Sequence, residues 1–149
     1  MTDDSKEFAF NSVIRWLRED NFVINEEKSI IVTSDFHAKM LSPAYPNHPI
    51  EIRSSPSLGN GILIQINLGL TPTQITTILS PDGKISLDVD RRISSVINSS
   101  KIVLSDNKED LIIEKMVLFG SRLLESKYEL VNFISNMLES ISSLPKMLN

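Results

Sequence analysis

Gly61-Ile62-Leu63-Ile64-Gln65-Ile66-Asn67-Leu68 is the stretch from which the fold of this chain can be worked out. Successive side chains of a β-strand point to opposite faces, so one face of this stretch would carry Ile62, Ile64, Ile66 and Leu68. The other face would carry Leu63, Gln65 and Asn67. Because only the first face is wholly apolar, we expect helices to pack on it and the second face to be only partly covered.

Another strand and two loops are predicted just before this stretch. Ile50-Glu51-Ile52-Arg53 alternates in polarity as a half-buried strand does. Residues 54–60 would form a loop that closes with Asn60-Gly61, a pair that tolerates the positive φ angles of a tight hairpin turn. Residues 43–49 contain three prolines, each of which lacks a backbone donor, and they predict a second loop.

The N-terminal part of the chain predicts a helix followed by a hairpin. Asp4 and Glu7 resemble a capping box, and the helix should end near Asp20-Asn21. Its apolar stripe would consist of Phe10, Val13, Ile14 and Leu17. Residues 22–25 and 29–33 are rich in β-branched side chains, and we interpret Glu26-Glu27-Lys28 as the polar connection of a hairpin between them.

Downstream of the long strand the pattern predicts a short helix. In Thr71-Pro72-Thr73-Gln74, threonine can cap the helix, proline suits its first position, and glutamine can complete the capping box. Ser80-Pro81-Asp82-Gly83 predicts a turn. The apolar spacing then changes from that of a strand to that of a helix, so we expect a strand-to-helix transition near Asp88.

The last third of the chain predicts a hairpin and a long helix. Residues 102–104 and 111–119 would pair across a polar tip at residues 105–110. Ser126 and Glu129 would form the capping box of the helix. Its apolar stripe would consist of Leu130, Phe133, Ile134, Met137, Leu138 and Ile141. The whole pattern predicts one α+β domain, residues 1–149, in which an antiparallel sheet is flanked by an N-terminal helix and a long C-terminal helix.

This order of elements resembles the type III secretion chaperone-like domains and the related bacterial sensory transduction regulators, some of whose relatives are archaeal. The residues that carry the resemblance are the opening helix, the stretch Lys101-Ile102-Val103-Leu104-Ser105-Asp106-Asn107, Leu111-Ile112-Ile113, and Ser126-Lys127-Tyr128-Glu129-Leu130. The resemblance implies an α/β sandwich that forms a homodimer and binds extended segments of other proteins through an apolar surface. A secretion apparatus does not follow from the fold.

Composition narrows the classes of function. The chain has 15 basic and 19 acidic residues and a net charge of −4, so nucleic acid is disfavoured as a partner. It contains no cysteine, which excludes thiol catalysis and thiolate metal sites. Residues 1–7 are acidic and polar, unlike a signal peptide, and the apolar stretch of residues 61–70 is too short to span a bilayer. We therefore expect a cytoplasmic protein with no membrane partner.

Candidate chemical groups are few. His37 and His48, with Asp35 or Glu51, could supply metal ligands, but their spacing matches no ligand pattern, and we interpret both histidines as surface residues. Asp88 and Asp90 could share one side of a strand, although paired carboxylates on a solvated edge are far commoner than a catalytic pair. The sequence therefore predicts no catalytic residue, metal or cofactor.

The candidate interface consists of apolar side chains beyond those assigned to the core: Trp16, Leu63, Ile112, Met116 and Leu118, with Met137 and Met147 beside them. Large apolar patches rarely stay exposed on monomers, and methionine adapts to varied partners. Our leading hypothesis is a homodimeric protein-binding or assembly module, of which a chaperone-like protein would be one form. Two alternatives stay open: a small-molecule enzyme or binding protein with a pocket near His37 and His48, and a nucleic-acid-associated regulator that uses Arg15 and Arg18 or Arg91-Arg92.

Overall fold

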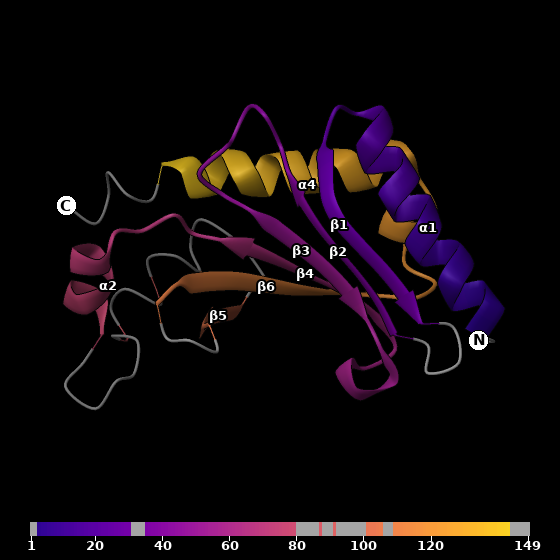
Figure 1. Ribbon diagram of the computed structural model, residues 1–149, viewed down its shortest axis with the longest axis horizontal. Helices are drawn as coiled ribbons and strands as arrows, with labels where there is room; N and C mark the ends of the chain where they lie inside the picture. The colour runs from indigo at the N-terminus through magenta and orange to yellow at the C-terminus, as the bar shows by residue number, and fades with distance from the viewer. Residues whose placement is uncertain are drawn as a thin grey trace.

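The long alternating stretch forms an inner strand of a six-stranded antiparallel sheet with the order β1-β2-β3-β4-β6-β5. The computed structural model describes residues 3–30, 35–79, 87, 91, 101–105 and 109–143 (Figure 1). Its strands are β1 (Val23–Ile30), β2 (Asp35–Leu41), β3 (Ile50–Ser54), β4 (Gly61–Asn67), β5 (Lys101–Leu104) and β6 (Leu111–Leu118). Its other elements include α1 (Asp3–Glu19), α2 (Pro72–Ile78), α4 (Lys127–Ser142) and the short 3-10 helices η1 (Pro56–Leu58) and η2 (Arg122–Leu124).

The core lies between one face of the sheet and the apolar stripes of α1 and α4. From the strands it takes Phe36, Ala38, Met40, Ile50, Ile52, Ile62, Ile64, Ile66, Leu111, Ile113 and Val117, all almost completely buried. From the helices it takes Phe10, Val13, Ile14, Leu17, Leu130, Ile134, Met137, Leu138 and Ile141. Phe10 of α1 stacks on Phe36 of β2, with 5.5 Å between the ring centroids. Figure 1 shows α4 passing behind the sheet and α1 at the side of β1.

The predicted α+β class is confirmed, because an antiparallel sheet is combined with an N-terminal and a C-terminal helix. The capping box of α2 is formed as predicted: the backbone of Gln74 donates to the Thr71 side chain, and the Gln74 side chain accepts from the Thr71 backbone. Ser126 likewise caps α4 by accepting from the backbone of Glu129. The turn at residues 80–83 and the transition near Asp88 lie outside the described residues.

The predicted hairpin between residues 22–25 and 29–33 is wrong. Glu26, Glu27 and Lys28 belong to the middle of β1, which pairs instead with β2, a strand that the sequence pattern did not predict. β1 lies at one edge of the sheet, and edge strands commonly carry charged residues. Asp4 is also not a cap, since α1 already includes Asp3.

The predicted turn at Asn60-Gly61 is wrong as well. Gly59 takes the positive φ angle of this loop, +118°, and Gly61 is the first residue of β4. A Cβ on Gly61 would overlap the carbonyl oxygen of Val117 on β6. Glycine is needed at position 61 because the backbones of β4 and β6 approach closely there. The turn of the chain lies before this position, at Gly59.

A surface ion pair joins the end of α1 to the start of α4. The ammonium group of Lys127 donates to the carboxylate of Glu19 across 2.7 Å. This hydrogen bond is the main reason why the pKa of Glu19 lies below its ordinary value of 4.5. The two helices are thus connected at the surface as well as through the core.

This ion pair predicts a pH dependence. Because the folded state holds the pKa of Glu19 below its unfolded value, its contribution to stability is complete above pH 4.5 and is lost as the pH falls through the lowered pKa. We expect the wild type to be more stable than Lys127→Met at neutral pH and the difference to shrink in acid, as measured by urea unfolding. A difference that stays constant down to the lowest pH would contradict this role.

Candidate protein interface

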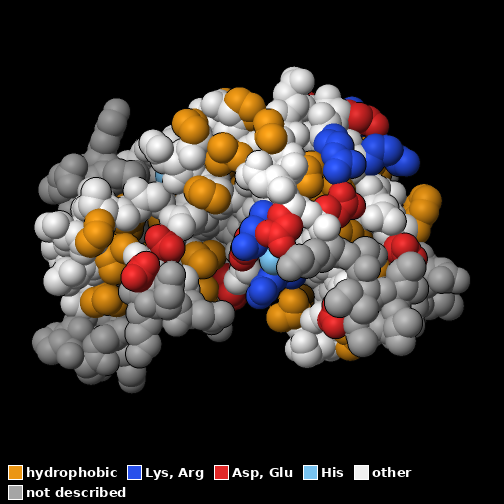
Figure 2. All heavy atoms as spheres, in the orientation of Figure 1, with side chains coloured by type: hydrophobic (Ala, Val, Ile, Leu, Met, Phe, Trp, Pro, Cys, Tyr) orange, Lys and Arg blue, Asp and Glu red, His pale blue; other side chains and the backbone are white. Residues whose placement is uncertain are grey.

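One face of the sheet carries neither α1 nor α4, and we call it the open face. The core side chains alternate with those that point to this face, which include His37, Lys39, Glu51, Arg53, Leu63, Gln65, Glu114 and Met116. α1 and α4, whose apolar stripes belong to the core, pack on the opposite face. Figure 2 shows basic and acidic side chains gathered in the middle of the molecule as seen from the open side.

A row of polar residues crosses the open face from one edge of the sheet to the other. The strand register places its six positions side by side, in the order Glu26, Lys39, Glu51, Gln65, Glu114 and Lys101. We call these six positions the central row. The ammonium nitrogen of Lys39 lies 3.8 Å from a Glu26 oxygen and 3.6 Å from a Glu51 oxygen. The Gln65 amide donates to Glu114 across 2.8 Å, so cross-strand contacts continue along the row.

Four of the five predicted interface residues meet on this face. Leu63 of β4 and Met116 of β6 are direct cross-strand partners, while Leu118 pairs with Gly61 and Ile112 with Asn67. We call Leu63, Ile112, Met116 and Leu118 the apolar patch. Leu118 is 58% exposed, Ile112 and Met116 are half-buried, and Leu63 is buried, with only 9% exposed. The patch therefore offers some apolar surface to solvent, mostly at β6.

The remaining interface candidates lie elsewhere. Trp16 is on α1, where it is half-buried against the core and belongs to the helical layer. Met137 of α4 is a core residue, so its assignment to a second surface is wrong. Met147 lies outside the described residues. Helical spacing also places Met137 in the apolar stripe of the last helix, and that prediction is the correct one.

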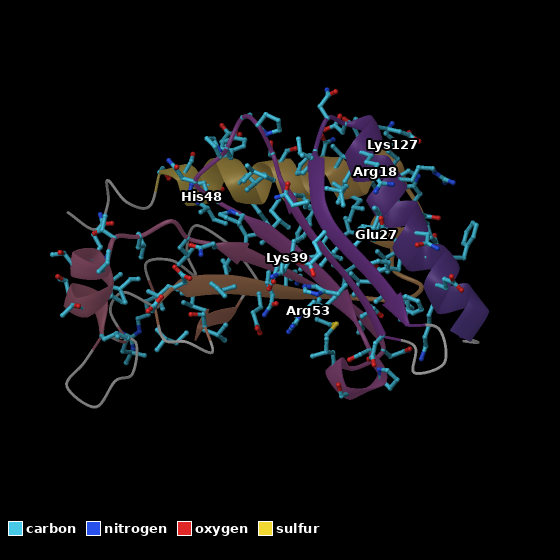
Figure 3. All side chains as sticks on the ribbon, in the orientation of Figure 1. Arg18, Glu27, Lys39, His48, Arg53 and Lys127 are labelled. Carbon is cyan, nitrogen blue, oxygen red and sulfur yellow. The ribbon has the colours of Figure 1, made fainter. Side chains whose placement is uncertain are left out.

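The two histidines do not share a site. His37 is on β2, on the open face, and its Nε2 lies 3.4 Å from a carboxylate oxygen of Glu51. His48 belongs to the loop before β3, and Figure 3 shows it at the other end of the sheet from Arg53, the cross-strand neighbour of His37. The prediction of a surface position is wrong for His48, which is buried. Its Nδ1 lies 3.0 Å from the Asn67 carbonyl oxygen, to which it can donate while joining the proline-rich loop to β4.

Two hollows open on the sheet. The larger, about 500 Å³, lies over the middle of the strands and is lined by Lys39, Glu51, Gln65, Asn67 and Ile112 among others. The smaller, about 330 Å³, lies at the η1 end and includes His37, Arg53 and Ser55. The smaller hollow thus includes one of the two histidines that were predicted to lie near a ligand pocket, and neither hollow includes His48. Among the described residues there is no group of three or more His, Asp or Glu side chains placed to hold a metal ion.

The other charged candidates are divided between described and undescribed segments. Arg18 of α1 pairs with Glu27 of β1 at 2.9 Å (Figure 3), and Arg15 lies 3.8 Å from Glu19, so both cations have a nearby carboxylate. Arg91 is exposed, whereas Arg92, Asp88 and Asp90 lie outside the described residues. Of the described helices, none has the length and apolarity that a bilayer crossing needs.

The charged members of the central row were not predicted from the sequence. Part of their signal was present, because Lys39 and Glu51 each belong to a stretch in which polar and apolar residues alternate, whereas Glu26 lies in a run of polar residues. Cross-strand register, which brings the six positions together, depends on loops and on the pairing of distant strands. The row can therefore be recognised only once the sheet order is known.

Comparisons with known proteins bear on the fold and not on the site. No family model matches the chain, and neither does any curated protein. It is similar to a crystal structure of an uncharacterized protein from Methanothermobacter thermautotrophicus, with a TM-score of 0.62 and 18% sequence identity. The similarity covers 94% of this chain and 96% of the other, and at this level of identity it shows a shared fold alone.

Proposed function

We propose that this chain is a non-enzymatic protein-binding module that acts as a homodimer, with the open face of the sheet as its interface. The observation that carries the proposal is the apolar patch on a sheet face that lies opposite α1 and α4. A layer of secondary structure normally buries each apolar face against another layer. A second polypeptide on the open face would supply that layer.

The composition of the open face favours a protein partner. Apolar side chains on β4 and β6 lie beside a strip that carries both Lys39 and the carboxylates Glu51 and Glu114. Protein interfaces contain both apolar area and polar groups that form hydrogen bonds across them. Polyanions such as nucleic acids would instead select a surface of one sign. The resemblance of the element order to chaperone-like domains agrees with a module that binds other polypeptides.

Leu118→Glu tests the proposal. Leu118 is more than half exposed, so the change should leave the fold intact while it places a charge in the apolar patch. We expect the wild type to show the mass of a dimer in gel filtration with light scattering and the variant to dissociate at least about tenfold more readily. Phe8→Glu is the matched control, because Phe8 is 70% exposed on α1. A monomeric wild type at every concentration would rule out the dimer.

A further inference from the structure

The central row has a property that the apolar patch lacks: its order of charges, read backwards, is complementary to itself. Forwards the row reads Glu26, Lys39, Glu51, Gln65, Glu114 and Lys101. Reversed against itself, the position of Glu26 meets the position of residue 101, Lys39 meets Glu114, and Glu51 meets the amide of Gln65. Each of the four inner positions therefore meets an opposite charge or a hydrogen-bonding group, and no like charges face each other among them.

We infer that the occupant of the open face is a second copy of this chain, packed sheet against sheet about a two-fold axis that runs parallel to the strands between β3 and β4. Such an axis reverses the order of the strands in the facing copy, which brings Lys39 of each subunit opposite Glu114 of the other. The inference rests on the proposed function and adds to it the orientation of the two subunits.

The rows beside the central row agree with this orientation. On one side, Leu41 and Val23 are cross-strand partners, and so are Ile112 and Val103. The same axis places Leu41 opposite Ile112 and Val23 opposite Val103, so apolar groups meet apolar groups. On the other side it places Met116 opposite His37 and Leu63 opposite Arg53, whose long aliphatic stem can cover a leucine.

A two-fold axis perpendicular to the strands suits the face less well. Such an axis could lie between the central row and the neighbouring row of His37, Arg53, Leu63 and Met116. It would place Glu51 of one subunit opposite Arg53 of the other, but it would also place Glu114 opposite Met116. It would also bring Lys39 against His37. A carboxylate buried on a thioether without a cation is costly, and the strand-parallel axis avoids this.

The geometry of packed sheets also defines which pair gives the best test. Aligned sheets pack about 10 Å apart with their strands rotated by about 30°, so facing positions are displaced more the farther they lie from the axis. Lys39 and Glu114 lie roughly 7 Å from the axis, and a displacement of about 4 Å there is within reach of a lysine.

The size of the sheet sets the expected affinity of the dimer. Six strands with about six residues each give a buried area of roughly 600 Å² per subunit, which is small for a specific interface, so we expect a micromolar dissociation constant.

Charge reversal at this pair tests the orientation. Lys39→Glu alone would face Glu114 of its partner copy, and Glu114→Lys alone would face Lys39, so each variant should dimerise at least about tenfold more weakly than the wild type. Mixed together, the two variants restore an opposite-charge pair at both sites of one heterodimer. We therefore expect native mass spectrometry of the mixture to show a heterodimer in preference to either homodimer. Circular dichroism would verify that each variant is folded.

A second measurement, cysteine cross-linking, adds no like charges beside those already present within one subunit. It is specific because the natural chain contains no cysteine. Lys39→Cys and Glu114→Cys variants, mixed and treated with a bismaleimide whose spacer is about 10 Å, should cross-link to each other more than to themselves. A wild type that dimerises but shows neither heterodimer preference nor this cross-link would overturn the orientation and leave the proposed function standing. A wild type that never dimerises would overturn both.

Discussion

Replacing Ile64 with alanine is expected to lower the free energy of unfolding by about 3–4 kcal/mol, within the range found when a large aliphatic side chain is removed from a rigid core. Ile64 is fully buried on β4, between β3 and β6, and faces the helical layer. Backbones hydrogen-bonded on both sides cannot close around the missing atoms, so a cavity should remain. Urea unfolding followed by circular dichroism would measure the loss.

Leu63→Ala is the matched control, because Leu63 is the neighbour of Ile64 on β4 and its side chain points to the open face. At concentrations low enough to keep the chain monomeric, we expect a smaller loss of about 1–2 kcal/mol, since the flexible side chain of Met116, its cross-strand partner, can fill part of the space. The dimer should weaken at the same time. Equal losses for the two variants, with no effect on dimerisation, would mean that the open face is covered within one subunit.

The difference between the two faces of β4 was readable from the sequence. A strict alternation of isoleucine with other residues, two of them polar, favours burial of one face alone, and the structure has Ile62, Ile64 and Ile66 fully buried on that face. The helical stripes and the caps at Thr71 and Ser126 were readable for the same reason, because they depend on neighbours within a few residues.

The features that could not be predicted depend on contacts between distant segments. Glu26-Glu27-Lys28 looks like a turn until β2 is known to pair with it and Glu27 is seen to accept from Arg18 of α1. His48 lies in the proline-rich loop of residues 43–49, where a surface residue would be expected, but that loop folds onto the end of β4 and the ring is buried. In both cases the local sequence was correctly read as polar, but contacts with a distant segment of the chain determined whether the residues form a turn or a strand and whether they are exposed or buried.

The candidate interface was half predictable. An excess of apolar residues on β4 and β6 could be counted, and four of the five named side chains share the open face. Trp16 does not share it, because a residue at the border of a helical stripe can turn either to the core or to solvent. The charge order of the central row adds an orientation that a count of apolar residues cannot supply.

Gly61→Ala is the second change with a large expected effect, and it links the stability of the sheet to the geometry of the open face. The new Cβ would overlap the carbonyl oxygen of Val117 and lie 2.9 Å from the Cα of Leu118. Both are backbone atoms of a paired strand, so β4 and β6 must separate locally. We expect a loss of about 3 kcal/mol in the free energy of unfolding, at the upper end of what overpacking costs.

Gly120→Ala separates this steric cost from the cost of backbone strain. Gly120 has a positive φ of +90°, and a Cβ added there would meet no described atom within 4 Å, so alanine should cost only about 1 kcal/mol. Separation of β4 from β6 would also move Leu118, the most exposed member of the apolar patch, and Gly61→Ala should therefore weaken the dimer while Gly120→Ala should not. Because Gly61 pairs with Leu118, two residues before Gly120, both glycines lie near the same end of the sheet. A similar loss in both variants would thus mean that conformational freedom, and not close backbone approach, selects glycine at position 61.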